Sequence, residues 1–184
     1  MPAHRAGPAL RQCLACLAGT NPSPDEVILV ADGDVDEIGG LADEFAVEFI
    51  RNPVSGGPAR ARNMGAARAR GDLLFFVDSD VAVAPDVIAR VRLAFSQDPQ
   101  LAAIFGSYDD QPAAPNFLSQ YKNLFHHYTH QTANEEASTF WGALGAMRRD
   151  VFVESGGFDE NYRRPCIEDI ELGERLKRAG HRIR

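Results

Sequence analysis

Cysteine is scarce in this chain, and long hydrophobic runs are absent from it. The 184 residues include only three cysteines, Cys13, Cys16 and Cys166, which cannot all pair and whose sparse use is typical of a reducing compartment. No apolar run approaches the roughly 18 residues that span a bilayer, and residues 1–10 lack the apolar centre of a signal peptide. The sequence therefore predicts a cytoplasmic protein with free thiols that neither spans a membrane nor is exported.

Positive charge is also in short supply. The chain has 19 lysines and arginines against 26 aspartates and glutamates, a formal net charge of -7. Such a balance opposes attraction to polyanions, so we expect no nucleic-acid partner. Hydrophobic residues make up 45% and charged residues 24%, which is close to the globular average. We expect one globular domain over residues 1–184.

Strands and helices alternate along most of the chain. The pattern predicts strands at 27–30, 47–50, 73–77 and 101–105, and helices at 8–17, 37–45, 58–70 and 87–95. Such alternation implies right-handed βαβ units, and thus an α/β fold: a three-layer α/β/α sandwich with a mostly parallel central sheet. Beyond residue 102 the alternation weakens to helices at 116–131 and 168–179 and short extended pieces at 138–147. This second half is expected to be built around a site.

Aspartates follow two of the predicted strands, where open α/β sheets bind their ligands. Asp32 follows the strand at 27–30, and Asp78 and Asp80 follow the strand at 73–77. If the chain stays extended there, Asp78 and Asp80 point to the same side. Their hard oxygens suit Mg²⁺ or Mn²⁺, whose coordination shell substrate phosphates often complete. The alternative is that these aspartates only make turns or cap a helix.

A second set of charged residues lies near two predicted helix starts. Glu168 and Asp169 open the helix at 168–179, where acids favour the helix dipole. The same position keeps a carboxylate ionised, as a general base requires. Arg62 follows the glycine at position 57, and its guanidinium suits phosphate or a pyrimidine carbonyl. The neighbouring arginines are expected to be surface residues.

Three other patterns have ordinary interpretations. Cys13 and Cys16 lie on a predicted helix without a second ligand pair, which favours packed thiols over a zinc or redox site. His126 and His130 are four residues apart, but no acid is spaced as in a metalloprotease, so substrate contact or polar surface is favoured over metal. Trp141 is followed by glycines that form no dinucleotide motif, and we expect it in the core, with the lining of a pocket as the alternative.

Several segments together resemble glycosyltransferase family 2, the inverting enzymes of GT-A fold that use nucleotide-sugar donors. Any one segment is a weak signal, but their order and spacing are specific, and they cover nearly the whole chain. The segments are 1–5, 27–33, 61–65, 71–80, 142–149, 156–159 and 167–172. One departure is Ala31, where the family commonly has an aspartate. The chain also stops at Arg184, before the Q-x-x-R-W element of processive members, so we expect no processive synthesis and a chain truncated at both ends.

The resemblance implies a division into a nucleotide-binding half, residues 1–106, and an acceptor-binding half, residues 107–184. It implies that Pro2, Ala3 and Asp32 hold the nucleoside, with Asp32 reading the base edge and Arg62 nearby. Asp80 would bind the metal directly, and Asp78 would contact the ribose or reach the metal through water.

In the acceptor half, the resemblance implies that Asp169 is the catalytic base and that Glu168 shapes the acceptor site. The expected reaction is metal-assisted, inverting transfer of a sugar from a nucleotide-diphosphate donor to a saccharide, lipid or other hydroxyl. A nucleotidyltransferase of related fold and a non-catalytic nucleotide-sugar-binding fragment remain alternatives. A longer parent chain would allow peripheral association with the cytoplasmic face of a membrane.

Overall fold

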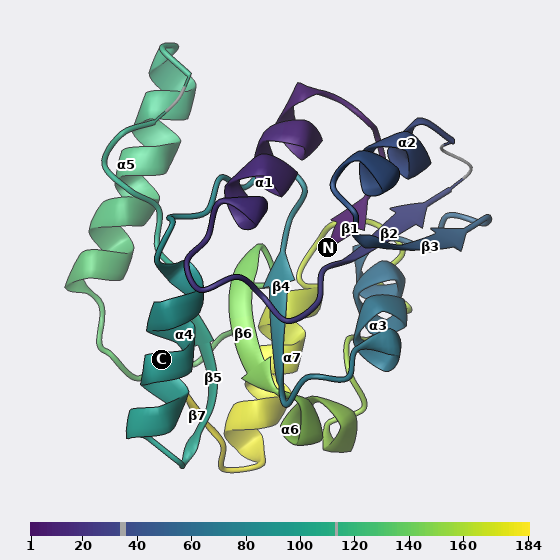
Figure 1. Ribbon diagram of the computed structural model, residues 1–184. Helices are drawn as coiled ribbons and strands as arrows, with labels where there is room; N and C mark the ends of the chain where they lie inside the picture. Colours follow the sequence, from purple (N-terminus) through teal and green to yellow (C-terminus); the bar gives the residue numbers. More distant parts are fainter. Residues whose placement is uncertain (34–35, 113) are drawn as a thin grey trace.

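The computed structural model describes residues 1–33, 36–112 and 114–184, in which helices and strands alternate as expected (Figure 1). The strands are β1 (Pro2–Ala3), β2 (Ile28–Asp32), β3 (Glu48–Asn52), β4 (Leu73–Val77), β5 (Leu101–Phe105), β6 (Leu144–Arg148) and β7 (Arg182–Ile183). The helices are α1 (Pro8–Ala18), α2 (Asp36–Glu44), α3 (Pro58–Arg68), α4 (Val87–Gln97), α5 (Phe117–Thr132), α6 (Arg149–Glu154) and α7 (Glu168–Arg178). The strands predicted at 73–77 and 101–105 are confirmed without change, and the other predicted elements differ by a few residues at their ends.

The strands form two hydrogen-bonded sheets. The first has the order β1-β2-β3, with both pairs parallel, and the second has the order β4-β6-β5-β7. β5 and β7 pair in parallel, but β6 runs antiparallel to both β4 and β5. The mostly parallel arrangement therefore holds in the amino-terminal half, whereas the second sheet is mixed.

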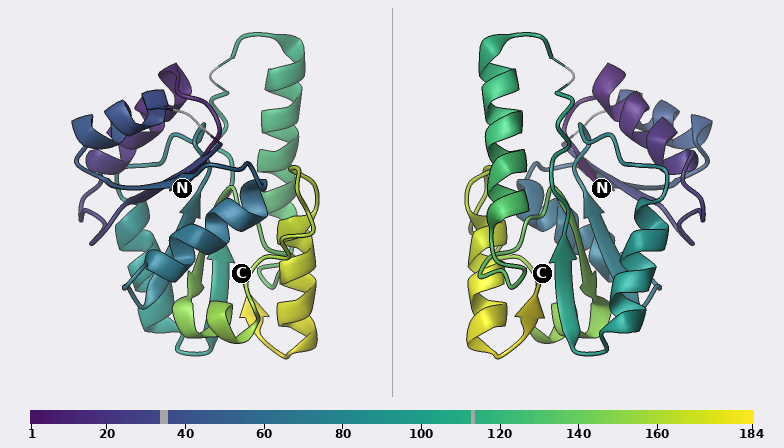
Figure 2. Two further views of the ribbon diagram at one scale, coloured as in Figure 1. Left: turned by 90° about the vertical axis from the view of Figure 1, so that its right-hand side faces the viewer. Right: turned by 90° about the vertical axis from the view of Figure 1, so that its left-hand side faces the viewer.

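The direction of β6 follows from the helix before it. Parallel neighbours need a connection that carries the chain back along the sheet. α5 lies beyond the ends of the strands rather than along the sheet (Figures 1 and 2). The chain thus enters β6 from the end where β5 finished, which makes the pair antiparallel.

Alternate residues of β4 show why the fold has three layers. Leu74 and Phe76 belong to the core cluster with α3, α6 and α7, whereas Leu73 and Phe75 pack with α4 on the other face. Val77 packs against α1 on that same face. Because successive strand residues point to opposite faces, an apolar run of this kind needs helices on both sides. The predicted three-layer α/β/α sandwich is confirmed.

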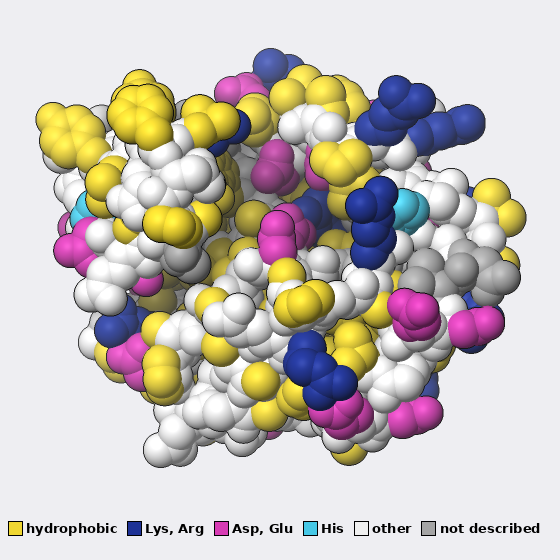
Figure 3. Space-filling model, turned by 90° about the horizontal axis from the view of Figure 1, so that it is seen from above, with side chains coloured by type: hydrophobic (Ala, Val, Ile, Leu, Met, Phe, Trp, Pro, Cys, Tyr) yellow, Lys and Arg dark blue, Asp and Glu magenta, His cyan; other side chains and the backbone are white. Residues whose placement is uncertain are grey.

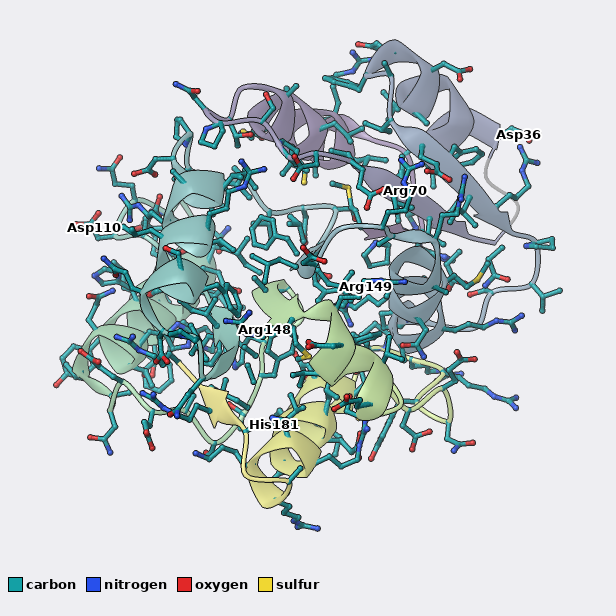
Figure 4. All side chains as sticks on the ribbon, turned by 60° about the horizontal axis from the view of Figure 1, so that its bottom comes forward. Asp36, Arg70, Asp110, Arg148, Arg149 and His181 are labelled. Carbon is teal, nitrogen blue, oxygen red and sulfur yellow. The ribbon has the colours of Figure 1, made fainter. Side chains whose placement is uncertain are left out.

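Arg148 lies at the end of the second sheet where β4 begins and β6 ends. Arg148 and Arg149 lie close together there (Figure 4). The Arg148 guanidinium donates to the carbonyls of Leu101 and Phe95 at 2.8 and 3.2 Å and lies 5.2 Å from the centre of the Phe95 ring. Arg148 thereby fastens the turn between α4 and β5 to the end of β6.

Phe76 is the test residue for this core. It is 5% exposed and its ring lies 5.3 Å from those of both Phe152 and Phe158. We expect Phe76→Ala to lower the free energy of unfolding by about 3–5 kcal/mol, because it leaves a cavity among aromatic rings. Denaturant unfolding measures this. Leu93→Ala, at a site 55% exposed, is the control and should change the same quantity by less than about 0.5 kcal/mol; equal losses would contradict this assignment of the core.

Candidate active site

Charged side chains gather in a hollow on the face beyond the arrowhead of β4 (Figures 1 and 3). The charged residues of this site come from α3, the end of β4 and the start of α7, three segments far apart in the sequence. Open α/β sheets bind ligands at such strand ends. The sequence prediction that the site lies here agrees with this hollow.

Arg62 is the centre of the site. It lies on α3 and is 5% exposed. Its Nη2 donates to Asp78 Oδ1 at 2.7 Å, and its Nη1 donates to Glu168 Oε1 at 2.9 Å. Its Cζ lies 5.4 Å from the centre of the Phe158 ring. One guanidinium therefore joins the D-x-D segment after β4 to the E-D segment of α7.

Arg62, Asp78 and Glu168 form a triad, in which burial and neighbouring charges have opposite effects on the pKa values of Arg62 and Asp78. Burial disfavours the cationic form of Arg62, but the carboxylates of Asp78 and Glu168 outweigh that effect and raise its pKa. Burial also raises the pKa of Asp78 above its ordinary value, although Arg62 opposes the increase. Arg62 therefore remains a cation, and burial disfavours the charged form of Asp78.

Asp169 lies directly beside the triad. Its Oδ2 accepts from the backbone N–H of Gly142 at 3.1 Å, and its Oδ1 accepts from the N–H of Ile170 at 2.8 Å. Glu168, the preceding residue, is 4% exposed and also accepts from the N–H of Cys166 at 2.9 Å. Two adjacent carboxylates are thus held apart by different partners, with Glu168 buried and Asp169 half-buried.

Gly142 allows this packing because it has no side chain. A Cβ at position 142 would lie 3.1 Å from Arg62 Cζ. The backbone of the Trp141–Gly142 segment can therefore lie against Arg62 while its N–H reaches Asp169. From the sequence, this glycine was excluded from a dinucleotide motif and placed in the segment 142–149 of the family resemblance, but its contact with Asp169 was not predicted.

The D-x-D segment differs from the expectation. β4 ends at Val77, and the chain then turns, with the N–H of Val81 donating to the carbonyl of Asp78 at 3.1 Å. The premise that residues 78–80 stay extended is wrong, because this turn hydrogen bond replaces strand pairing. Asp78 points to Arg62, whereas Asp80 is exposed.

The two aspartates still suit a divalent cation. Among the described residues, no group of three or more His, Cys, Asp and Glu side chains is arranged to hold a metal ion. Mg²⁺ and Mn²⁺ do not need such a group, since Mg²⁺ is commonly held by one or two carboxylates together with water and substrate phosphates. The donor set of Asp78 and Asp80 fits that description.

Asp32 occupies a separate, buried position. It is 6% exposed, and its carboxylate accepts four hydrogen bonds, from Asn52 Nδ2, Ser55 Oγ and the backbone N–H groups of Gly56 and Gly57, at 2.8–3.0 Å. These donors outweigh the effect of burial and lower the pKa of Asp32. Asp32 thus fixes the loop that leads directly into α3 and Arg62.

Pro2 and Ala3 form β1, next to the end of β2. They pair with Val30 and Ala31 in parallel register. Ala3 is 2% exposed and its side chain packs in the core under α1 and α2, so this side chain is not accessible to a ligand. The structure places both residues beside Asp32 rather than in the Arg62 triad.

An aromatic cluster borders the site, and the sequence identified its members His126, His130 and Trp141 but not Tyr108 or Phe105. Trp141 packs against His130, His126, Tyr108 and Phe105, with ring centres 4.7, 5.2, 6.1 and 6.3 Å away. Burial, followed by the nearby charges of Asp80 and Asp78, raises the pKa of Tyr108. Tyr108 follows β5, so the rule of ligands beyond strand ends could have identified it.

The other residues singled out in the sequence, the cysteines, the histidines and Trp141, are held by packing contacts. Cys13 is buried and its Sγ donates to the carbonyl of Asp78 at 3.5 Å, and burial raises the pKa of this thiol to about 12. All three cysteines are free, as expected. His126 and His130 are half-buried against Trp141 rather than part of a polar surface, and their other expected role, substrate contact, stays a prediction. Trp141 is half-buried rather than in the core.

Arg62 gives the first test of the site. We expect Arg62→Met to lower the free energy of unfolding by about 3–5 kcal/mol, because two carboxylates lose the cation that compensates their burial. Adding Glu168→Gln to this variant should recover part of the loss, since one uncompensated charge is removed. Denaturant unfolding gives both values. Arg60→Met, at an exposed position on the same helix, is the control; a similar cost for Arg60 and Arg62 would refute the compensating role.

Comparison with known proteins identifies relatives of one kind. A probable glycosyltransferase of Bacillus subtilis, YdaM, is 26% identical over 100% of this chain and 47% of its own length. The glucosyl-dolichyl phosphate glucuronosyltransferase of Haloferax volcanii is 25% identical over 82% of this chain and 51% of its own. The chain therefore spans about half the length of these relatives.

A solved structure shares the fold. The mannosyltransferase PcManGT of Pyrobaculum calidifontis, determined with GDP-Man and Mn²⁺, superposes with a TM-score of 0.71 at 20% identity. The match covers 99% of this chain and 52% of that one. The family model of glycosyl transferase family 2 matches residues 1–156, which include Asp32, Arg62, Asp78 and Asp80. The chain belongs to glycosyl transferase family 2.

Proposed function

We propose that this chain is the donor-binding and catalytic part of an inverting glycosyltransferase, which moves a sugar from a nucleotide-diphosphate donor to an acceptor hydroxyl with the help of Mg²⁺ or Mn²⁺. The observation that carries the proposal is the contact of Arg62 with both Asp78 and Glu168, directly beside Asp169. Membership of the family supports the chemistry. The division into a nucleotide-binding half, 1–106, and an acceptor-binding half, 107–184, is part of the same proposal.

The nucleoside is proposed to bind between β1 and the loop after β3. Pro2 and Ala3 contribute backbone there. Asp32 already accepts four hydrogen bonds, so its effect on the base comes at least in part through the loop it holds. Arg62 acts on the donor by orienting Asp78, because the guanidinium is buried and engaged by two carboxylates.

The diphosphate is proposed to lie at the D-x-D turn. Asp80 would bind the metal directly, with Asp78 contacting it through water or holding the ribose. A divalent cation at this position neutralises charge that develops on the nucleotide-diphosphate leaving group. The Mn²⁺ in the structure of the related mannosyltransferase supports this choice of cofactor.

Asp169 is proposed as the base. The N–H groups of Gly142 and Ile170 orient its carboxylate at the start of α7. It takes the proton of the acceptor hydroxyl as that oxygen forms a bond to the anomeric carbon, while the bond to the diphosphate breaks on the opposite face. This single displacement inverts the anomeric configuration. Glu168 shapes the acceptor site by holding Arg62 and the chain at Cys166.

The acceptor is proposed to be a saccharide, a lipid or another hydroxyl compound, with no nucleic acid involved. The Haloferax relative, a glucosyl-dolichyl phosphate glucuronosyltransferase, supports a lipid-linked acceptor. Among the described residues, no helix is both long enough and apolar enough to cross a bilayer. Cytoplasmic location, at the membrane face in a longer chain, belongs to the proposal.

Asp80 tests the metal site. We expect a nucleotide diphosphate to bind more tightly with Mn²⁺ than with EDTA, and Asp80→Ala to remove that difference because an oxygen ligand is lost. Calorimetry measures both affinities. Asp43→Ala, at an exposed position on α2, should retain the metal response. Equal affinity of the unmodified chain with and without Mn²⁺ would rule out the proposed cofactor role.

Asp169 tests the base. We expect Asp169→Asn to leave donor affinity unchanged within about twofold and to slow single-turnover transfer by roughly 10²–10⁴, since the amide keeps the shape but not the basicity. Glu168→Gln should be milder. Glu174→Gln, an exposed site on the same helix, is the control. Transfer by Asp169→Asn within about threefold of the unmodified protein would exclude this base, because the loss is far below that range.

A further inference from the structure

α5 exposes an aromatic stripe that the proposed chemistry does not use. None of the described side chains of this helix is buried. We define the aromatic stripe by six residues and their exposed fractions: Phe117 83%, Leu118 60%, Tyr121 56%, Leu124 42%, Phe125 52% and Tyr128 66%. Hydrophobic side chains gather visibly over α5 at the upper left of Figure 3. A contiguous surface of this kind marks an interaction site.

The stripe is ordered along the helix. Phe117, Tyr121 and Phe125 follow each other at four-residue spacing, which places them on one face. Their rings are stacked, with centres 6.2 and 6.0 Å apart and interplanar angles of 18° and 19°. Other exposed large apolar residues, such as Val54, Leu93 and Val153, lie on separate segments, and single exposures are normal.

The charge on α5 selects the kind of partner. The helix has one lysine, Lys122, and three histidines, and no acidic residue between Phe117 and Thr132, in a chain of net charge -7. Histidine is neutral at pH 7, so Lys122 is the one positive charge of the helix. A second copy docked by the same stripe would bring two positively charged helices together, with no acidic residue of α5 to pair with Lys122. An anionic partner is complementary to this helix.

The position of α5 fits a broad, flat partner. The helix projects beyond the ends of the strands and away from the other helices (Figures 1 and 2). Tyrosine rings with a polar tip, apolar side chains and a lysine are the residues that bind the headgroup region of membranes. We propose that α5 docks through the aromatic stripe into the interface of an anionic lipid bilayer.

Docking there has a consequence for the active site. His126 and His130 on the same helix pack against Trp141, whose neighbour Gly142 donates to Asp169. α5 therefore contacts, through Trp141, the same short segment that donates a hydrogen bond to the proposed base. This arrangement suits an acceptor hydroxyl carried on a membrane lipid, a consequence that rests on the proposed function, whereas docking itself does not.

Vesicle flotation tests the docking. We expect the protein to float with phosphatidylcholine vesicles that contain phosphatidylglycerol, and less with phosphatidylcholine alone. The triple variant Phe117→Ser, Tyr121→Ser, Phe125→Ser should bind these vesicles at least roughly tenfold more weakly than the parent, because three aromatic rings that would be buried in the bilayer are removed. The matched control, Val54→Ser, Leu93→Ser, Val153→Ser, should float like the parent. All six sites are exposed, and melting temperatures establish that both variants fold.

Several outcomes overturn the proposal: a parent protein that does not float, a stripe variant that floats like the parent, or a parent dimer in analytical ultracentrifugation that only the stripe variant dissociates. Asp169→Asn separates the two proposals, since it should float like the parent. Lost transfer with retained flotation concerns the base, and lost flotation with retained transfer to a soluble acceptor concerns the aromatic stripe.

Discussion

The buried guanidinium of Arg62 is the constraint on which the site depends. A cation that is 5% exposed persists only where anions and hydrogen bonds compensate its desolvation. Asp78 and Glu168 supply that compensation from segments that follow β4 and begin α7. Folding therefore cannot bury Arg62 without bringing the two segments together. The electrostatic requirement of one side chain thus brings together the two segments that border the hollow.

A second network determines where Arg62 lies. Asp32 gathers four donors from residues 52–57, and α3 begins at Pro58 immediately afterwards. Gly57 has a φ of 87° and lies so close to Arg163 that a Cβ there would be 2.5 Å from its carbonyl oxygen. The loop held by Asp32 therefore packs against the segment that leads into α7. The two carboxylate networks support the same contact between the halves of the chain.

Local patterns predicted the layers and strand ends because those depend on periodicity and on apolar runs such as β4. They placed Asp78, Glu168 and Asp169 near helix starts and strand ends for the same reason. They could not predict the bond between Arg62 and Glu168, which are separated by 106 positions, nor the four donors around Asp32. The turn after Val77 was not predicted either, since it depends on one hydrogen bond between Val81 and Asp78. Contacts between distant segments depend on packing that no short pattern contains.

The path of α5 explains why the site and the aromatic stripe are neighbours. Since α5 stays beyond the strand ends instead of crossing the sheet, the chain returns through Trp141 and Gly142 directly above the start of the antiparallel strand β6. That return places the N–H of Gly142 against Asp169 and the Trp141 ring under His126 and His130. A helix packed along the sheet would have buried its apolar face and left Asp169 without this partner. The path of α5 beyond the strand ends thus leaves the aromatic stripe exposed and also gives the proposed base its hydrogen bond from Gly142.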